Sequence, residues 1–296
     1  MDWDARAVRE LIAAALAEDG AADDVTTRLT VPADLPAQAE ILAKQDCVLA
    51  GLELAPRIFA VFATTFAASR AATGGPAPAA IVTPAAGIAD GVRVGAGQAI
   101  AAIRGAARDL LACERVLLNF LQRLCGIATL TADYAAAVRG TRARILDTRK
   151  TLPGWRALDK YAVTCGGGVN HRAGLGDGIL IKNNHIRLAG GAGEALRRAL
   201  ARAPAGMTVE IEVRTPEELA AALAGGARRI LLDNMTAAEV RAAVAQTAGR
   251  AALEVSGGVT LATVRAYAET GADFISVGAL THSAPAVDLA LRIWRQ

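Results

Sequence analysis

The chain lacks the cysteine patterns that mark disulfide-rich and zinc-binding proteins. It has only four cysteines, at Cys47, Cys113, Cys125 and Cys165. None of them forms a CxxC pair or another metal-like spacing, so we expect reduced, mostly buried residues of a cytosolic protein. The chain also opens without the basic segment of a secretory signal, because Asp2 and Asp4 stand in its place.

Long apolar runs and an excess of one charge are also absent. No uninterrupted apolar stretch is long enough to span a membrane, and the mean hydropathy of +0.32 comes largely from alanine. The 32 basic and 29 acidic residues leave a formal net charge of only +3, which is no footprint for nucleic acid. The sequence therefore predicts a soluble cytoplasmic protein that binds neither nucleic acid nor membrane. Its positive charge is local, with seven Lys and Arg against two Asp between Arg139 and Lys160.

Residues 1–112 have the pattern of a compact α/β domain. An apolar stripe from Val8 to Leu16 predicts an amphipathic helix that ends near Gly20. Residues 37–50 alternate like a strand, and residues 54–66 predict a second helix. Residues 71–91 are rich in Ala, Gly and Pro and predict loops with short strands, and residues 90–105 predict two short strands.

Residues 113–296 alternate between strand and helix patterns after a long apolar helix that starts near Asp109. Six short apolar runs are strand candidates: 143–147, 178–182, 208–213, 229–233, 251–255 and 273–278. Helices are predicted to begin near Pro216, Thr236 and Thr260. Such repeats predict a parallel sheet with helical crossovers, either a complete or incomplete (β/α) barrel or an open doubly wound sheet. A C-terminal helix near 285–296 is expected to pack on the first domain.

Every predicted strand of this second domain ends in a polar, charged or glycine residue. The ends are Asp147-Thr148-Arg149-Lys150, Lys182, Glu212, Asp233, Ser256-Gly257-Gly258 and Gly278-Ala279. One such residue commonly just leaves the core. Six of them would meet at a single mouth in a (β/α) barrel, where active sites are built.

The residues at this mouth fall into three chemical groups. The cations Arg149, Lys150, His171, Arg172 and Lys182 predict a pocket for a small polyanion, because interiors rarely accept such charges unpaired. Glu212 and Asp233 suit Mg²⁺ or sugar hydroxyls. The glycine turns offer backbone N–H groups to a phosphate. A phosphorylated sugar with Mg²⁺, together with a small or aromatic carboxylate, would fill all three.

From about residue 8 to its C-terminus the chain resembles the quinolinate phosphoribosyltransferase family, also called nicotinate-nucleotide pyrophosphorylase (carboxylating). The resemblance is carried by ILDTRKTLPGWRALDKYAVTCGGGVNHR (145–172) and ILIKNNHI (179–186). Residues 114–131, 211–213, 231–235, 254–259 and 274–283 add to it. It implies an N-terminal α/β sandwich domain and an incomplete (β/α) barrel. It also implies a homodimer with composite active sites, in which one subunit's N-terminal domain covers the barrel mouth of the other.

The resemblance further implies a reaction in which quinolinate and phosphoribosyl pyrophosphate give nicotinate mononucleotide, pyrophosphate and carbon dioxide. Arg149, His171 and Arg172 would hold the quinolinate carboxylates, with Thr148 beside them and Arg115 reaching in from the partner subunit. Lys150 and Lys182 would meet phosphates of the donor and the pyridine carboxylate. Glu212 and Asp233 would bind ribose hydroxyls and Mg²⁺, directly or through water. Ser256, Gly257, Gly258, Val277, Gly278 and Ala279 would cradle the 5′-phosphate.

One residue departs from the family pattern, and three other functions fit parts of the sequence. Asn183 stands where many relatives have Asp, which puts a metal or positioning role for that residue in doubt. A molybdate-transport-associated paralogue of the same fold would lack parts of the basic motif. A Schiff-base aldolase would use Lys182 at the end of its strand. A non-enzymatic anion-binding protein would leave Glu212 and Asp233 without a purpose.

Overall fold

The computed structural model describes residues 1–66 and 79–296, so residues 71–78 of the predicted loop region lie outside the description. The chain forms two compact units. The first contains Met1–Leu130, Pro153–Gly166 and Ala284–Gln296, and the second contains Thr131–Leu152 and Gly167–Ser283. This division differs from a single boundary after residue 112, because helix α5 (Ala107–Ala137) is continuous and two later segments return to the first unit.

The first unit is built on an antiparallel sheet in the order β12-β1-β5-β3. Its strands are β1 (Pro36–Ala43), β3 (Ile81–Pro84), β5 (Ala99–Ala106) and β12 (Leu289–Arg295). Alternate residues of β1 are buried, which is the period expected of a strand with one covered face. Around this sheet are α1 (Arg6–Glu18), η1 (Ala21–Asp23), α2 (Val25–Thr30), α3 (Leu54–Thr65), α6 (Arg156–Cys165) and the pair β2 (Cys47–Val48) and β4 (Arg93–Val94).

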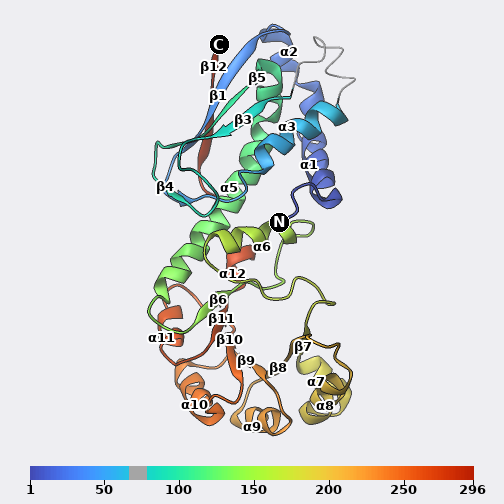
Figure 1. Ribbon diagram of the computed structural model, residues 1–296, viewed down its shortest axis with the longest axis vertical. Helices are drawn as coiled ribbons and strands as arrows, with labels where there is room; N and C mark the ends of the chain where they lie inside the picture. Colours follow the sequence, from blue (N-terminus) through green and yellow to red (C-terminus); the bar gives the residue numbers. More distant parts are fainter. Residues whose placement is uncertain (67–78) are drawn as a thin grey trace. The chain divides into compact units, whose positions relative to one another are not determined.

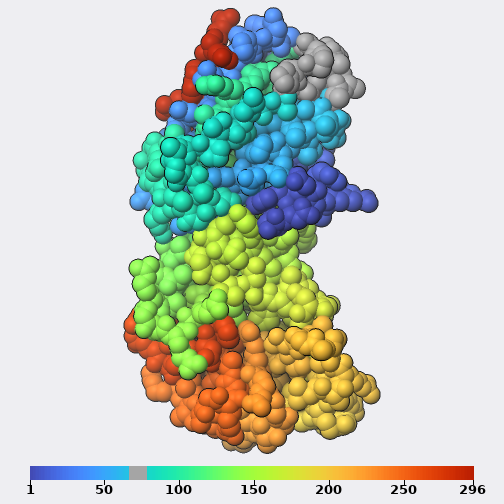
Figure 2. Space-filling model, in the orientation of Figure 1, coloured from blue at the N-terminus to red at the C-terminus, as the bar shows by residue number. Residues whose placement is uncertain are grey.

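Two predicted elements of this unit differ from the structure. The run 37–50 is two strands, because β1 ends at Ala43 and β2 begins at Cys47. The segment near 285–296 is a strand instead of a helix, and β12 pairs with β1 from Ala37↔Arg295 to Ala43↔Leu289. In Figure 2 these two segments, blue and red, lie side by side at the surface. The apolar residues Leu289, Leu291 and Ile293 recur with the period of a strand, and pairing with β1 decides the outcome.

The second unit holds a parallel sheet of six strands in the order β6-β11-β10-β9-β8-β7 (Figure 1). The strands are β6 (Arg144–Leu146), β7 (Ile179–Ile181), β8 (Val209–Val213), β9 (Arg229–Asp233), β10 (Ala252–Ser256) and β11 (Phe274–Ser276). All six predicted strands are therefore confirmed. Within the described chain β6 and β7 remain edge strands that do not pair with each other, so the barrel is incomplete.

The helices of this unit follow the strands in the crossover positions that the repeats predict. They are α7 (Asn183–Ala189), α8 (Ala192–Arg202), α9 (Pro216–Ala224), α10 (Ala237–Thr247), α11 (Val264–Ala268) and α12 (Ala279–His282). Thr215 and Thr236 cap α9 and α10, since each side chain accepts the N–H of a glutamate three residues later. The helix predicted near Thr260 begins later, because residues 260–263 first form a turn.

Side-chain alternation along the parallel strands decides which residues face the interior of the barrel. Ile211, Ile230 and Val255 are buried apolar residues of one strand face. Their neighbours in sequence, such as Glu212 and Glu254, share the opposite face, and both lie in register with Leu231. The sheet thus turns its polar residues inward, where they can form a site.

The structure also bears on the predictions made for the four cysteines and for membrane-spanning segments. Cys47, Cys113 and Cys125 are buried, Cys165 is half-buried, and no disulfide joins any of the four. Among the described residues no helix has both the length and the apolar character to cross a bilayer.

Candidate functional site

A pocket of about 500 Å³ opens at the carboxyl ends of the six parallel strands. Fourteen of the predicted site residues line it: Thr148, Arg149, Lys150, His171, Arg172, Lys182, Glu212, Asp233, Ser256, Gly257, Gly258, Val277, Gly278 and Ala279. The remaining predicted site residue, Arg115, does not line this pocket and is exposed on α5. The structure therefore gathers in one pocket residues that are up to 131 positions apart in the sequence, from Thr148 to Ala279.

Two arginines, Arg149 and Arg172, bring positive charge to the pocket. The Nε of Arg149 is buried and has no hydrogen-bond acceptor among the described residues. Burial lowers the pKa of Arg172, and the nearby charge of Arg149 lowers it further. A buried donor without a partner costs about 1–3 kcal/mol. The buried Nε of Arg149 is consequently available to an anion such as a carboxylate.

The acidic pair of the pocket, Glu212 and Asp233, already contacts cations of the chain. Arg214 lies 2.8 Å from Asp233 and 3.7 Å from Glu212, and the Lys182 Nζ lies 3.9 Å from Glu212. Burial raises the pKa of Glu212, and the charge of Asp233 raises it further. Hard carboxylate oxygens fit Mg²⁺. Arg214 already forms an ion pair with Asp233. For this reason Mg²⁺ held through water fits the site better than Mg²⁺ bound directly by both carboxylates.

Two glycine turns form the third part of the pocket. Gly257 and Gly258, after β10, have φ values of 105° and 62°, which L side chains rarely adopt. The N–H groups of Gly257, Gly258, Gly278 and Ala279 donate no hydrogen bond within the described part of the chain. Available N–H groups on adjacent turns are suited to phosphate oxygens. Thr281 fixes the neighbouring loop by donating to the carbonyl of Lys150 at 2.7 Å.

A buried aspartate connects the two basic segments of the pocket. Asp147 is fully buried at the end of β6 and accepts the His171 N–H at 2.7 Å. The adjacent Leu146 pairs with Val169 in an isolated parallel bridge. These contacts bring the segment 169–172 beside the Thr148–Lys150 turn, which explains why residues more than twenty positions apart serve one site.

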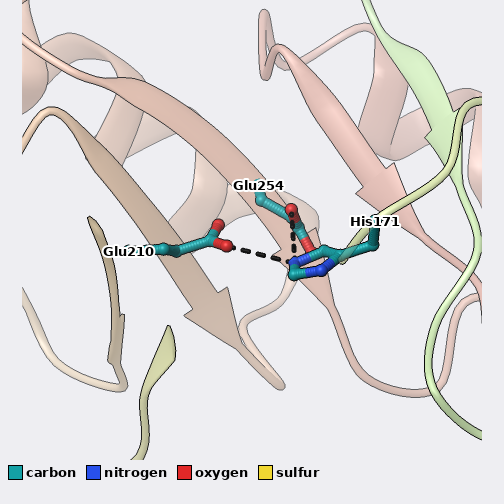
Figure 3. A group of neighbouring side chains, drawn as sticks. All are labelled: His171, Glu210 and Glu254. Carbon is teal, nitrogen blue, oxygen red and sulfur yellow. Dashed lines mark hydrogen bonds and ion pairs between the residues drawn. The ribbon is translucent and has the colours of Figure 1, made fainter. Parts of the chain in front are cut away.

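His171 belongs to a charged cluster whose other members, Glu210, Arg229 and Glu254, the sequence did not point to. The His171 Nε2 lies 3.1 Å from Glu210 and 3.7 Å from Glu254 (Figure 3). Arg229 joins the two carboxylates, donating to Glu210 at 3.0 Å and to Glu254 at 2.7 Å. The signal was present in VEIEV (209–213), because alternation places Glu210 on the same strand face as Glu212.

The charges of this cluster argue against a metal among His171, Glu210 and Glu254, although their ligand atoms lie within 4.8 Å of one another. Arg229 already supplies the cation. Burial works to raise the pKa of Glu210, but the His171 hydrogen bond and the Arg229 charge outweigh it and lower the pKa. Burial and the charge of Glu210 raise the pKa of Glu254 to about 7. The cluster is consequently balanced by a proton on Glu254 near neutral pH.

This raised pKa gives an expected pH dependence of folding stability. Glu254 binds its proton more tightly in the folded chain, so its contribution is complete at low pH and is lost as pH rises from about 4.5 to 7. Glu254→Gln stays neutral throughout. The variant should gain up to about 3 kcal/mol of unfolding free energy relative to the parent between pH 5 and 8. Urea unfolding across that range measures it, and parallel curves for the two proteins would contradict the assignment.

Comparison with known proteins gives matches along nearly the whole chain. The family model described as quinolinate phosphoribosyl transferase, N-terminal domain, matches residues 24–125, and that of the C-terminal domain matches residues 127–292. The chain is 42% identical over 298 residues to nicotinate-nucleotide pyrophosphorylase (carboxylating) of Mycobacterium leprae, covering 98% of each protein. It is 40% identical over 305 residues to the mitochondrial quinolinate phosphoribosyltransferase (decarboxylating) 2b of Nicotiana tabacum, covering 97% of this chain and 82% of the relative.

Solved structures agree with these sequence matches. NadC from Streptococcus pyogenes superposes with a TM-score of 0.88 at 36% identity, covering 97% of this chain and 96% of that one. The nicotinate-nucleotide pyrophosphorylase of Francisella tularensis has a TM-score of 0.83, also at 36% identity, with the same coverage. Both units of the described chain therefore have counterparts in experimental structures.

Proposed function

Since the chain belongs to the quinolinate phosphoribosyltransferase family, we propose that it transfers the phosphoribosyl group of phosphoribosyl pyrophosphate to quinolinate. The products are nicotinate mononucleotide, pyrophosphate and carbon dioxide, in de novo NAD biosynthesis (EC 2.4.2.19). The observation that carries the proposal is the composition of the pocket. It joins an unpartnered arginine donor, an acidic pair and two glycine turns, which match a dicarboxylate, a ribose and a phosphate.

Quinolinate is proposed to bind at the two arginines. Arg149 and Arg172 would each take a carboxylate, since a guanidinium fork fits a carboxylate with two hydrogen bonds. Thr148 and His171 line the same pocket. The buried Nε of Arg149 would then gain the acceptor that no described residue of the chain provides.

The sugar donor is proposed to bind across the rest of the mouth. Glu212 and Asp233 would accept hydrogen bonds from the ribose hydroxyls and contact Mg²⁺ through water. The turns at Ser256-Gly257-Gly258 and Val277-Gly278-Ala279 would hold the 5′-phosphate through backbone N–H groups. Lys150 and Lys182 would lie against the remaining phosphates and the pyridine carboxylate.

The chemistry then needs positioning and fixed charge, and no covalent nucleophile. The C1–oxygen bond to pyrophosphate breaks as the pyridine nitrogen bonds to C1, through a transition state with oxocarbenium character, as in glycoside chemistry. Lys150 and Lys182 neutralise the charge that develops on the leaving pyrophosphate. Mg²⁺, when bound with the donor, supplies further positive charge there. The ribosylated nitrogen is cationic, so it stabilises the electron pair left on C2 when carbon dioxide departs and a proton replaces it.

The oligomeric state and the cellular location of the protein are also proposals. A homodimer would complete each site with Arg115 of the partner chain, which agrees with the exposure of Arg115 on α5. The cytoplasm is the proposed location, supported by the bacterial relative and by the absence of disulfides among the four cysteines.

The aldolase alternative is less well supported by the environment of Lys182. Schiff-base lysines are activated by desolvation or by a neighbouring cation. The Lys182 side chain is 53% exposed, and its near neighbour is the carboxylate of Glu212. This environment supports a lysine that binds anions better than one that attacks a carbonyl.

The proposed function is tested first by substrate choice. With phosphoribosyl pyrophosphate and Mg²⁺, quinolinate should be converted to nicotinate mononucleotide and carbon dioxide. Nicotinate has one carboxylate and would leave one arginine unpaired, which costs about 1.5–3 kcal/mol, or roughly a 10- to 150-fold loss of kcat/KM. Product chromatography with both acceptors measures the ratio. Equal kcat/KM for the two acids would contradict the two-arginine clamp, and no turnover of quinolinate would contradict the function.

The second expected outcome concerns metal removal. Excess EDTA should stop turnover, and Mg²⁺ added beyond the chelator should restore it, because the pyrophosphate charge exceeds what two lysines neutralise. EDTA presaturated with Mg²⁺ is the control for effects of the chelator itself. Full turnover in metal-free buffer would remove Mg²⁺ from the proposal.

A further inference from the structure

Glu210 is a buried residue of β8, and its two oxygens accept from two different donors. Its Oε2 faces the His171 Nε2 at 3.1 Å, and its Oε1 accepts from the Arg229 Nε at 3.0 Å. Its side chain is only 3% exposed, so both contacts are made by a buried carboxylate. An ionised carboxylate meets both demands, whereas an amide has a single acceptor oxygen.

The other ring nitrogen of His171 is engaged as well. The Arg172 N–H donates to the His171 Nδ1 at 2.8 Å, so Nδ1 carries a lone pair and the proton is on Nε2. The His171 backbone N–H is held by Asp147. The Arg172 guanidinium reaches the Gly178 carbonyl at 3.0 Å, and its side chain lines the pocket. An unbroken series of contacts therefore runs from Glu210 through His171 to Arg172.

We propose that Glu210 is a positioning residue of the dicarboxylate site, which fixes His171 as the Nε2–H tautomer and thereby sets the backbone of Arg172. His171 then supports the arginine clamp, and both of its ring nitrogens bond to the protein and not to the substrate. The inference rests on the proposed function for the identity of the substrate. The tautomer and the contacts that define it do not depend on that function.

Isosteric variants separate this role from general damage. Glu210→Gln leaves either His171 or Arg229 facing an amide NH₂, so the KM for quinolinate should rise about 10-fold or more, the cost of one buried unpaired donor. The KM for phosphoribosyl pyrophosphate should change less than about 2-fold, because its proposed contacts lie elsewhere in the pocket. Equal rises in both KM values would overturn the proposal.

Glu254→Gln is the matched comparison on the neighbouring strand. Glu254 accepts from Arg229 through one oxygen, and its other oxygen has no partner among the described residues. A glutamine can keep the first contact and place its NH₂ at the second position. Glu254→Gln should therefore raise the KM for quinolinate less than Glu210→Gln does. An equal or larger effect would contradict the argument from two acceptors.

A double-mutant cycle tests whether Glu210 acts through His171. His171→Asn retains an acceptor near the Arg172 N–H but is too short to reach Glu210. If the series of contacts is real, Glu210→Gln should add less than about 2-fold to the KM for quinolinate in the His171→Asn background. Fully multiplicative effects would show that Glu210 acts independently of His171, and the proposal would fail.

Nitrogen-15 NMR of histidine-labelled protein tests the tautomer without any assay of turnover. The chain has three histidines, and the His171 signals are those missing from His171→Asn. We expect an Nε2–H imidazole in the free protein and the same tautomer after quinolinate alone is added. An Nδ1–H form, an imidazolium, or a change of tautomer on addition would overturn the inference. If the parent protein shows no turnover, the proposed function is contradicted. The NMR measurement would still decide whether His171 is the Nε2–H tautomer.

Discussion

Replacing Gly257 by alanine is expected to lower kcat/KM at least about 100-fold, equivalent to about 2.7 kcal/mol of transition-state stabilisation. The added Cβ would collide with the Asn234 side chain, at 2.6 Å from its Cγ, and would lie 3.1 Å from its Cα. Gly257 also has a φ of 105°, which strains any residue with a side chain. The turn must therefore shift, and the proposed phosphate site shifts with it.

Asn234 cannot move aside without disturbing the acidic pair. It has a left-handed φ of 57°, and its Nδ2 donates to the Asp233 Oδ1 at 2.9 Å. Displacing Asn234 would consequently reorient Asp233, which is proposed to meet the ribose and Mg²⁺. We expect the loss mainly in the KM for phosphoribosyl pyrophosphate, measured by steady-state kinetics with quinolinate held saturating.

Gly249→Ala is the control for positive φ alone. Gly249 has a φ of 74° after α10, a Cβ added there would meet no atom within 4 Å, and the residue does not line the pocket. The substitution should cost about 1 kcal/mol of stability and leave kcat/KM unchanged. Near-parental kcat/KM in Gly257→Ala would show that this turn does not hold the donor.

The sequence predicted the six parallel strands well because each one is a short apolar run between turn or capping residues. Strand ends such as Lys182 and Asp233 were identified for the same reason, since carboxyl ends of parallel strands share one edge. Glu210 and Glu254 lie inside their strands, at positions that the pattern assigns to a buried face. Which donors would satisfy them depends on Arg229 and His171, and no local pattern specifies contacts across that distance.

The C-terminal strand β12 shows a second limit of sequence-based prediction. Its residues Leu289–Arg295 pair with β1, more than 240 positions earlier. Short apolar segments without flanking signals fit a helix or a strand, and a distant edge decides between them. Asn183, whose metal or positioning role the sequence put in doubt, begins α7 directly after Lys182.

Mixing an Arg115→Ala chain with an Arg172→Ala chain is expected to restore activity that neither has alone. Each single variant should lose about 100-fold or more of kcat/KM, since each lacks a cation proposed to contact quinolinate. If subunits exchange freely, half of the dimers are mixed, and half of the sites in those dimers contain both arginines. About a quarter of the parental activity should therefore return in a two-fold symmetric dimer with shared sites.

The matched control pairs Arg172→Ala with Arg149→Ala. Both residues line the pocket of a single chain, so every site in a mixed dimer of these two variants lacks one arginine. No activity should return in that mixture. Native mass spectrometry of variants that differ in mass establishes that mixed dimers have formed. If they have formed and the Arg115 mixture stays inactive, Arg115 acts within its own chain and the composite site is wrong. Recovery confined to the Arg115 mixture would show that this exposed arginine completes the site of the partner subunit.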